Sequence, residues 1–235
     1  VISLDTMNIT FADLPGDSED YICRVNWLLD NQSLAIQTQS RNQQRLDLLV
    51  WNSTTTQINQ LLTEQSTTWL NLHDIFYPLA NGEEFIWASE RSGYQHLYHY
   101  NLNGTLLNTL TSGSWVVTDL CRVCEESATG IRVYFEGFMD TPLEKHLYCV
   151  DFNADPSPQR ITKPGYFHST TFSTSYPYFI DHFSSAATPP AVALRNLDGD
   201  TISDLAVNEL NEAHPYHPYR ASRGIVSFGE LEAED

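Results

Sequence analysis

Basic residues are scarce in this sequence. Twelve lysines and arginines stand against 30 aspartates and glutamates, and the formal net charge of the 235 residues is −18. A surface this negative repels phosphate backbones, so we expect no nucleic-acid partner. Solubility is the plain interpretation of the charge, and an acidic vestibule that attracts cationic peptide amines is the functional one. No run of about eighteen apolar residues occurs either, so no segment is expected to span a membrane.

Cysteine is also rare, and the four residues are Cys23, Cys121, Cys124 and Cys149. Cys121 and Cys124 have the spacing of half a zinc site, but a structural zinc needs four ligands and no second pair has suitable spacing. We predict a strand over 116–123, in which residues three apart point to opposite faces. We therefore expect free or partly buried thiols, with no metal and no other cofactor.

Motifs for catalysis are missing as well. The sequence has no G-x-S-x-G nucleophile elbow, no phosphate-binding glycine loop and no HExxH helix. The closest segment to an elbow, TSGSW (111–115), lacks the second glycine. We expect no catalytic residue in this chain.

Polar clusters that could bind a ligand have simpler interpretations. His96 and His146 recur at the same place of successive repeats, which indicates a packing role. The segment NLDGD (196–200) is better explained as a hairpin turn than as a calcium loop, because Thr201 stands where that loop needs glycine. Two glutamate pairs, Glu83-Glu84 and Glu125-Glu126, could bind an ammonium group, but we expect them in water at hairpin tips.

An internal repeat of roughly fifty residues dominates what the sequence does contain. Four similar segments end at residues 51, 101, 151 and 196, and each is followed nine or ten residues later by an aliphatic residue. The segments are LDLLVW (46–51), HLYHYN (96–101), HLYCVD (146–151) and AVALRN (191–196). Turns with Asn, Asp and Gly lie between, as in Asn103-Gly104 and Asp198-Gly199, which suit hairpins.

The other half of each repeat supplies two more strands. An aromatic step opens it, as at Tyr21, Trp69, Trp115 and Phe167, and the second strands are predicted at 33–39, 84–90, 132–138 and 178–184. Four short strands per fifty residues are typical of a β-propeller blade, which must stack on its neighbours. A β-sandwich is the alternative, but it does not explain a repeat that survives four copies.

We therefore predict an all-β fold: a partial β-propeller of about four and a half four-stranded antiparallel blades, from a ring of eight. The predicted domain covers 1–214, with a hairpin at 1–14 and blades at about 20–66, 67–112, 113–163 and 164–210. The remaining residues, 215–235, are predicted to form a linker and a first strand, GIVSFGEL (224–231), that leads to an absent domain. The sequence is thus expected to be a piece of a larger protein.

The sequences of the repeats, taken in order, resemble those of one enzyme family. The segment FIWASERSGYQHLYHYNL (85–102) resembles the propeller of dipeptidyl peptidase IV enzymes of the prolyl oligopeptidase clan. The later blades of that family are similar, in order, to further segments: DYICRVNW (20–27), LTSGSWVVTDL (110–120), TPLEKHLYCVD (141–151) and ATPPAVALRNLDG (187–199). The resemblance covers nearly the whole chain.

The resemblance implies a serine exopeptidase that releases X-Pro or X-Ala dipeptides from peptide N-termini. Its implied partners are the peptide substrate, an α/β-hydrolase domain of the same protein with the catalytic Ser, Asp and His, and a second copy in a homodimer. A periplasmic or secreted location is implied too. The family's glutamate pair for the substrate amine has no match here, so no such role passes to either pair in this chain.

Two site residues follow from the resemblance. We expect an inner strand in TTWLNLHDIFY (67–77), which aligns with a segment that borders the substrate site in the family. His73 and Asp74 are the expected substrate-binding residues, although an aromatic-basic pair stands there in relatives, and plain lining of a channel is the alternative. For the whole protein, the alternatives are a binding or scaffold propeller without a hydrolase domain, and an acylaminoacyl peptidase or oligopeptidase.

Overall fold

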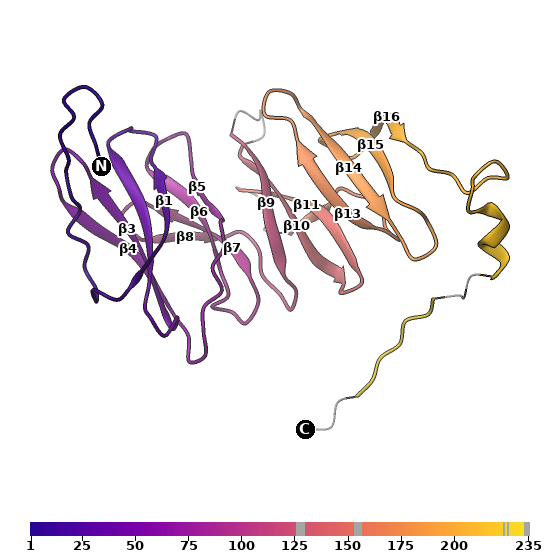
Figure 1. Ribbon diagram of the computed structural model, residues 1–235, viewed down its shortest axis with the longest axis horizontal. Coiled ribbons are helices and arrows are strands. Elements are labelled where there is room, and N and C mark those ends of the chain that lie inside the picture. Colours follow the sequence, from indigo (N-terminus) through magenta and orange to yellow (C-terminus); the bar gives the residue numbers. More distant parts are fainter. Residues whose placement is uncertain (126–129, 153–156, 223, 225, 233–235) are drawn as a thin grey trace. The chain divides into compact units, whose positions relative to one another are not determined.

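The computed structural model describes residues 1–125, 130–152, 157–222, 224 and 226–232. Sixteen strands form four four-stranded antiparallel sheets, each with its strands paired in chain order (Figure 1). Such a series of meanders is the fold of a partial β-propeller. The predicted fold class is confirmed. The size of the complete ring stays a prediction.

The first compact unit consists of Val1–Val117, Cys124–Arg132 and Val150–Ser157. Its first sheet contains β1 (Tyr21–Trp27), β2 (Ser33–Gln39), β3 (Arg45–Asn52) and β4 (Ile58–Gln65). Its second sheet contains β5 (Phe76–Pro78), β6 (Glu84–Ser89), β7 (His96–Asn101) and β8 (Leu106–Thr109). Large apolar side chains of the two sheets form one core, with Leu48, Phe85 and Trp87 fully buried.

The second unit consists of Thr118–Val123, Val133–Cys149 and Pro158–Asp235. Its strands are β9 (Val117–Cys124), β10 (Arg132–Thr141), β11 (Glu144–Asp151), β12 (Gln159–Arg160), β13 (Phe167–Phe172), β14 (Tyr178–Ser184), β15 (Ala191–Asn196) and β16 (Thr201–Ala206). Aromatic rings connect its two sheets: Tyr134 of β10 lies 5.5 Å from Phe172 of β13, measured between ring centroids.

The repeat is also visible in the hairpin that joins the third and fourth strands. In the second sheet, Asn101 Oδ1 accepts the backbone N–H of Asn103 at 3.0 Å and of Thr105 at 2.9 Å. Asn196 does the same in the fourth sheet, toward the N–H groups of Asp198 and Asp200. NLDGD is therefore a hairpin turn, as predicted.

Three expected segments differ in extent from the structure. The predicted hairpin 1–14 is a short one, in which the Ile2–Ile9 bridge lies between backbone hydrogen bonds of Val1 with Thr10 and of Ser3 with Asn8, and Leu14 packs on the core of the first sheet. The predicted inner strand 67–77 is reduced to β5, because the chain before it bonds to the neighbouring sheet instead. No strand forms in the described part of 224–231, since an isolated strand leaves its backbone groups without partners.

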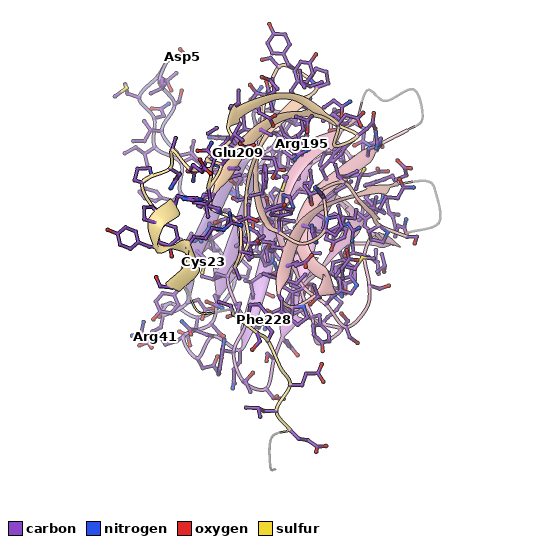
Figure 2. All side chains as sticks on the ribbon, turned by 90° about the vertical axis from the view of Figure 1, so that its right-hand side faces the viewer. Asp5, Cys23, Arg41, Arg195, Glu209 and Phe228 are labelled. Atoms are coloured by element: carbon purple, nitrogen blue, oxygen red, sulfur yellow. The ribbon has the colours of Figure 1, made fainter. Side chains whose placement is uncertain are left out.

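The C-terminal segment carries one short 3-10 helix, η1 (His217–Ser222). Beyond η1 the described residues are extended, and Phe228 is 66% exposed (Figure 2). Among the residues that the structure describes, no helix has the length and apolar character needed to cross a bilayer.

Candidate functional site

His73 and Asp74 lie in the loop between β4 and β5, and this loop is fastened to the first sheet. The backbone N–H of Leu70 donates to Gln43 O at 2.8 Å, and Gln39 Nε2 donates to Leu70 O at 3.0 Å. Gln44 Nε2 adds a bond to Thr67 O. These bonds use the backbone and amide groups of the β2–β3 turn, so the segment follows the first sheet and does not extend β5.

Asp74 presents its carboxylate to solvent, with 81% of the side chain exposed. It forms an ion pair with Arg24 of β1, whose Nη1 also donates to the carbonyl oxygen of Cys23 at 2.8 Å. The hydrogen bond and charge of Asp74 raise the pKa of Arg24. An exposed pair of this kind adds little stability, but it fixes where the carboxylate points.

His73 has the opposite environment. Its ring meets the indole of Trp87 edge-on, with centroids 4.5 Å apart. Burial lowers the pKa of His73, and a backbone hydrogen bond at Ala88 opposes this shift less strongly. The ring is therefore neutral at pH 7. Its Nδ1 is buried and has no hydrogen-bond partner in the described part of the chain.

A small cavity of about 20 Å³ lies beside the His73 ring. Its polar wall includes Glu64 and Glu90, and each already has a partner: Glu64 accepts from Trp87 Nε1 at 3.2 Å, and Glu90 accepts from Asn71 at 3.1 Å. A space of this size holds one water molecule. The site thus offers an exposed carboxylate next to a neutral, half-buried imidazole.

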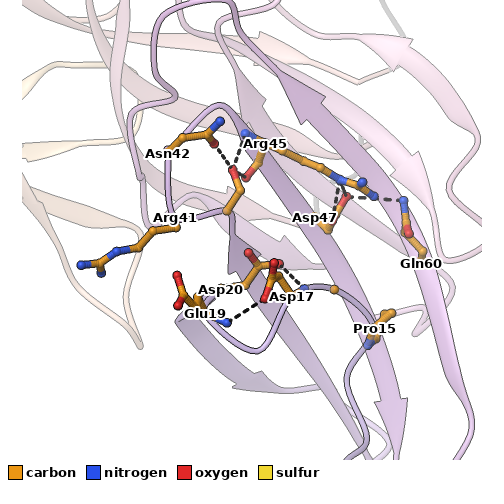
Figure 3. Close-up of a pocket in the computed structure, with 11 residues that line it drawn as sticks. Pro15, Asp17, Glu19, Asp20, Arg41, Asn42, Arg45, Asp47 and Gln60 are labelled. Atoms are coloured by element: carbon orange, nitrogen blue, oxygen red, sulfur yellow. Dashed lines mark hydrogen bonds and ion pairs between the residues drawn. The ribbon is translucent and has the colours of Figure 1, made fainter.

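A second cavity, of about 530 Å³, lies between the segment before β1 and the β2–β3 turn (Figure 3). Some of its polar groups already have partners: Arg45 pairs with Asp47 at 2.9 Å, and the Asp20 carboxylate accepts the backbone N–H of Asp17 at 3.1 Å. Neither His73 nor Asp74 lines it. We assign no ligand to this cavity.

Of the glutamate pairs, Glu83 is exposed as expected, but Glu84 and Glu125 are not. Glu84 opens β6, and its Oε2 lies 2.9 Å from Nε2 of His99. Glu125 accepts the backbone N–H of Ala80 at 2.7 Å. Both carboxylates are partnered, so solvated turn charge is wrong for them, because neighbouring strands and loops offer donors that a view of one hairpin does not include. Glu126 lies outside the described residues.

No disulfide joins any of the four cysteines, all of which lie among the described residues, and Cys149 is buried. Burial raises the pKa of Cys121 to about 12, and the Glu136 carboxylate adds to the shift. Cys121 is therefore a protonated, inert thiol at neutral pH. No group of three or more His, Cys, Asp or Glu side chains that could hold a metal occurs among the described residues.

Sequence resemblance predicted His73 and Asp74 as site residues, but no sequence pattern indicated that Arg24 contacts Asp74. Arg24 lies 50 residues before its partner Asp74 and belongs to another repeat. The only signal that could have found this contact is the stacking of successive repeats, which places the inner strand of one sheet beside the first loop of the next.

Comparison with known proteins gives a consistent group of matches. The family model of the dipeptidyl peptidase IV (DPP IV) N-terminal region matches residues 1–190. Dipeptidyl peptidase 8 of Mus musculus is 31% identical over 193 residues, which are 70% of this chain and 21% of that protein. A probable dipeptidyl peptidase 4 of Emericella nidulans is 26% identical over 201 residues, 80% of this chain and 26% of that protein.

Two further matches extend the comparison. Prolyl endopeptidase FAP of Bos taurus is 25% identical over 214 residues, 86% of this chain and 26% of that protein. The crystal structure of Porphyromonas gingivalis dipeptidyl peptidase 4 superposes with a TM-score of 0.82 at 23% identity, over 93% of this chain and 30% of that one. The chain thus spans between a fifth and a third of the length of these proteins.

Proposed function

We propose, since this chain belongs to the dipeptidyl peptidase IV N-terminal region family, that it is the non-catalytic propeller part of a serine exopeptidase. The enzyme releases X-Pro or X-Ala dipeptides from peptide N-termini. The Ser, Asp and His of an α/β-hydrolase domain in the same protein perform the chemistry, and the propeller admits and orients the peptide. The family match over residues 1–190 carries this proposal.

Within that role, we assign the contact with substrate to the loop that contains His73 and Asp74. Asp74 is exposed and held by Arg24, so its carboxylate can accept hydrogen bonds from a peptide without first being ordered. His73 acts behind it as an apolar support, because its ring is neutral and packs on Trp87.

A second candidate is cleavage within a peptide chain. It is favoured by the match to prolyl endopeptidase FAP, which covers 86% of this chain. The two activities differ in whether a free N-terminal amine is required. A chromogenic Gly-Pro substrate and its N-acetylated form separate them: an exopeptidase cleaves only the first, and an endopeptidase cleaves both.

Substitution of Asp74 in the full-length protein tests the orienting role. We expect Asp74→Asn to raise KM for a longer X-Pro peptide by about threefold to tenfold, which corresponds to a lost hydrogen bond of about 0.7–1.4 kcal/mol, with kcat nearly unchanged. Asp204→Asn, at an exposed position of β16, is the matched control and should leave KM unchanged. Equal KM values for the Asp74 variant and the parent would remove Asp74 from the site.

A further inference from the structure

Two histidines of the repeat make the same bonds. His146 Nδ1 lies 2.9 Å from Thr162 Oγ1, and that oxygen already accepts the backbone N–H of Leu147 at 3.1 Å. The same hydroxyl keeps its hydrogen, which can donate to Nδ1 of a neutral ring. His96 and Thr111 repeat this arrangement in the second sheet. In its neutral form each imidazole can accept the threonine hydrogen at Nδ1 and carry its own hydrogen on Nε2.

The contacts of Nε2, the other ring nitrogen of His146, are consistent with a hydrogen on that atom. Nε2 lies 3.0 Å from Glu144 Oε2, an acceptor that also takes the N–H of Gly165 at 2.9 Å. The His146 side chain is fully buried. Burial lowers the pKa of His146, and the bond to Glu144 opposes the shift less strongly. A proton added at Nδ1 would require the Thr162 hydroxyl to turn its hydrogen away and to accept with its second lone pair.

His168, on β13 of the adjacent sheet, differs because its two hydrogen bonds need a hydrogen on each ring nitrogen. Its Nδ1 lies 2.8 Å from Asp181 Oδ1 and its Nε2 lies 2.8 Å from the carbonyl oxygen of Lys163. A carboxylate and a carbonyl oxygen only accept, so both bonds form only when both ring nitrogens carry hydrogen. Asp181 is fully buried and also accepts from Arg195 Nε at 2.7 Å.

The two rings are neighbours, with centroids 5.2 Å apart. We propose that His146 is a proton-operated switch at the junction of the two sheets of the second unit: the junction holds while His146 is neutral and loosens when it gains a proton beside the charged His168. Two cations at this distance in a buried site repel each other strongly. The titratable and charged groups around the pair are Glu144 and Tyr148 of β11, Arg160 of β12, Asp181 of β14, Arg195 of β15, and Lys163 and Tyr166 before β13.

The direction of the pH effect follows from His146. In the unfolded chain a histidine gains its proton near pH 6.5, and the folded unit takes it only at lower pH because burial lowers the pKa of His146. The open state therefore binds more protons in this window, and the stability of the junction falls as the pH falls. One group can raise the opening equilibrium constant by at most about tenfold per pH unit.

Hydrogen exchange of the full-length protein at pH 7.5 and pH 5.5, corrected for intrinsic exchange rates, tests the switch. We expect peptides from β11 and β13 to lose protection at pH 5.5 by severalfold, up to about tenfold. Peptides from β7 should keep theirs, because His96 has the same threonine bond but the ring of Trp115, and not a second imidazole, beside it at 4.8 Å. Equal behaviour of β7 and β11 in the parent protein would overturn the proposal, and this comparison needs no variant.

Two variants test whether His146 causes the pH dependence of hydrogen exchange. His146→Gln cannot gain a proton and should remove the pH dependence of β11 and β13. His96→Gln is the control and should leave that dependence as it is in the parent. A pH dependence that persists in His146→Gln would contradict the proposal, because another group would then be its cause.

Discussion

At the scale of single residues, two glycines show why the last hairpins of the second and fourth sheets each carry a glycine at the tip. Gly104 has φ +81° and Gly199 has φ +90°, and a Cβ on either would overlap a carbonyl oxygen of the preceding sheet. That oxygen belongs to Leu61 in one case and to Ile161 in the other, two of the four aliphatic residues that mark the sequence repeat. The repeat therefore records a contact between sheets as well as the strands within them.

Substitution of these glycines has a predictable cost. We expect Gly104→Ala to lower the free energy of unfolding by about 2 kcal/mol or more, because a left-handed backbone and a steric overlap add. Gly82→Ala is the control: its φ is +71° but nothing lies within 4 Å of the added Cβ, so only the backbone term, about 1 kcal/mol, should remain. Urea denaturation of the three proteins measures both. Equal losses would show that the contact with Leu61 is unimportant.

Thr56 has a positive φ although it is not a glycine. It has φ +59°, which is a strained conformation for a β-branched residue. We expect Thr56→Asn to raise the free energy of unfolding by about 1 kcal/mol, since asparagine tolerates this region better. Thr54→Asn, at an exposed position of the same turn, should change it little. A thermal unfolding midpoint that does not rise in the Thr56 variant would contradict this account.

At the scale of elements, third strands were predictable almost to the residue, because each is an apolar run between turn residues. Predicted 96–101 and 191–196 match β7 and β15. The first strands were harder. The segment 67–77 alternates poorly, and the bond of Leu70 to Gln43 of another repeat holds most of it outside the sheet. His73 and Asp74 were therefore placed on the right segment but on the wrong element, and Arg24 could not be paired with Asp74 from local pattern.

The histidine–threonine pairs recur at the same place of two repeats, and their contribution to the free energy of unfolding can be measured. Thr111→Val and Thr162→Val keep the shape of the side chain but remove an oxygen that accepts a backbone N–H and bonds a buried imidazole. We expect each to cost about 2–3 kcal/mol, because two buried polar groups lose their partner. Thr118→Val is the control, since no partner for its buried hydroxyl is found among the described residues; it should cost little. Chemical denaturation compares the three variants.

At the scale of the whole molecule, we expect the propeller and the catalytic domain to have separate roles. The four sheets resemble those of dipeptidyl peptidases in fold and order, and the chain covers between a fifth and a third of such proteins. The sequence offers neither a nucleophile elbow nor a triad. We therefore expect the 235-residue chain by itself to lack peptidase activity, and the full-length protein to possess it.

Release of dipeptides from a peptide such as Gly-Pro-Ala-Ala, followed by mass spectrometry, tests this central claim most directly. The account predicts Gly-Pro release by the full-length protein, no release by the isolated chain at equal concentration, and no cleavage of the N-acetylated peptide. Turnover by the isolated chain that persists through further purification would contradict it. So would a full-length protein that folds and leaves the free peptide intact.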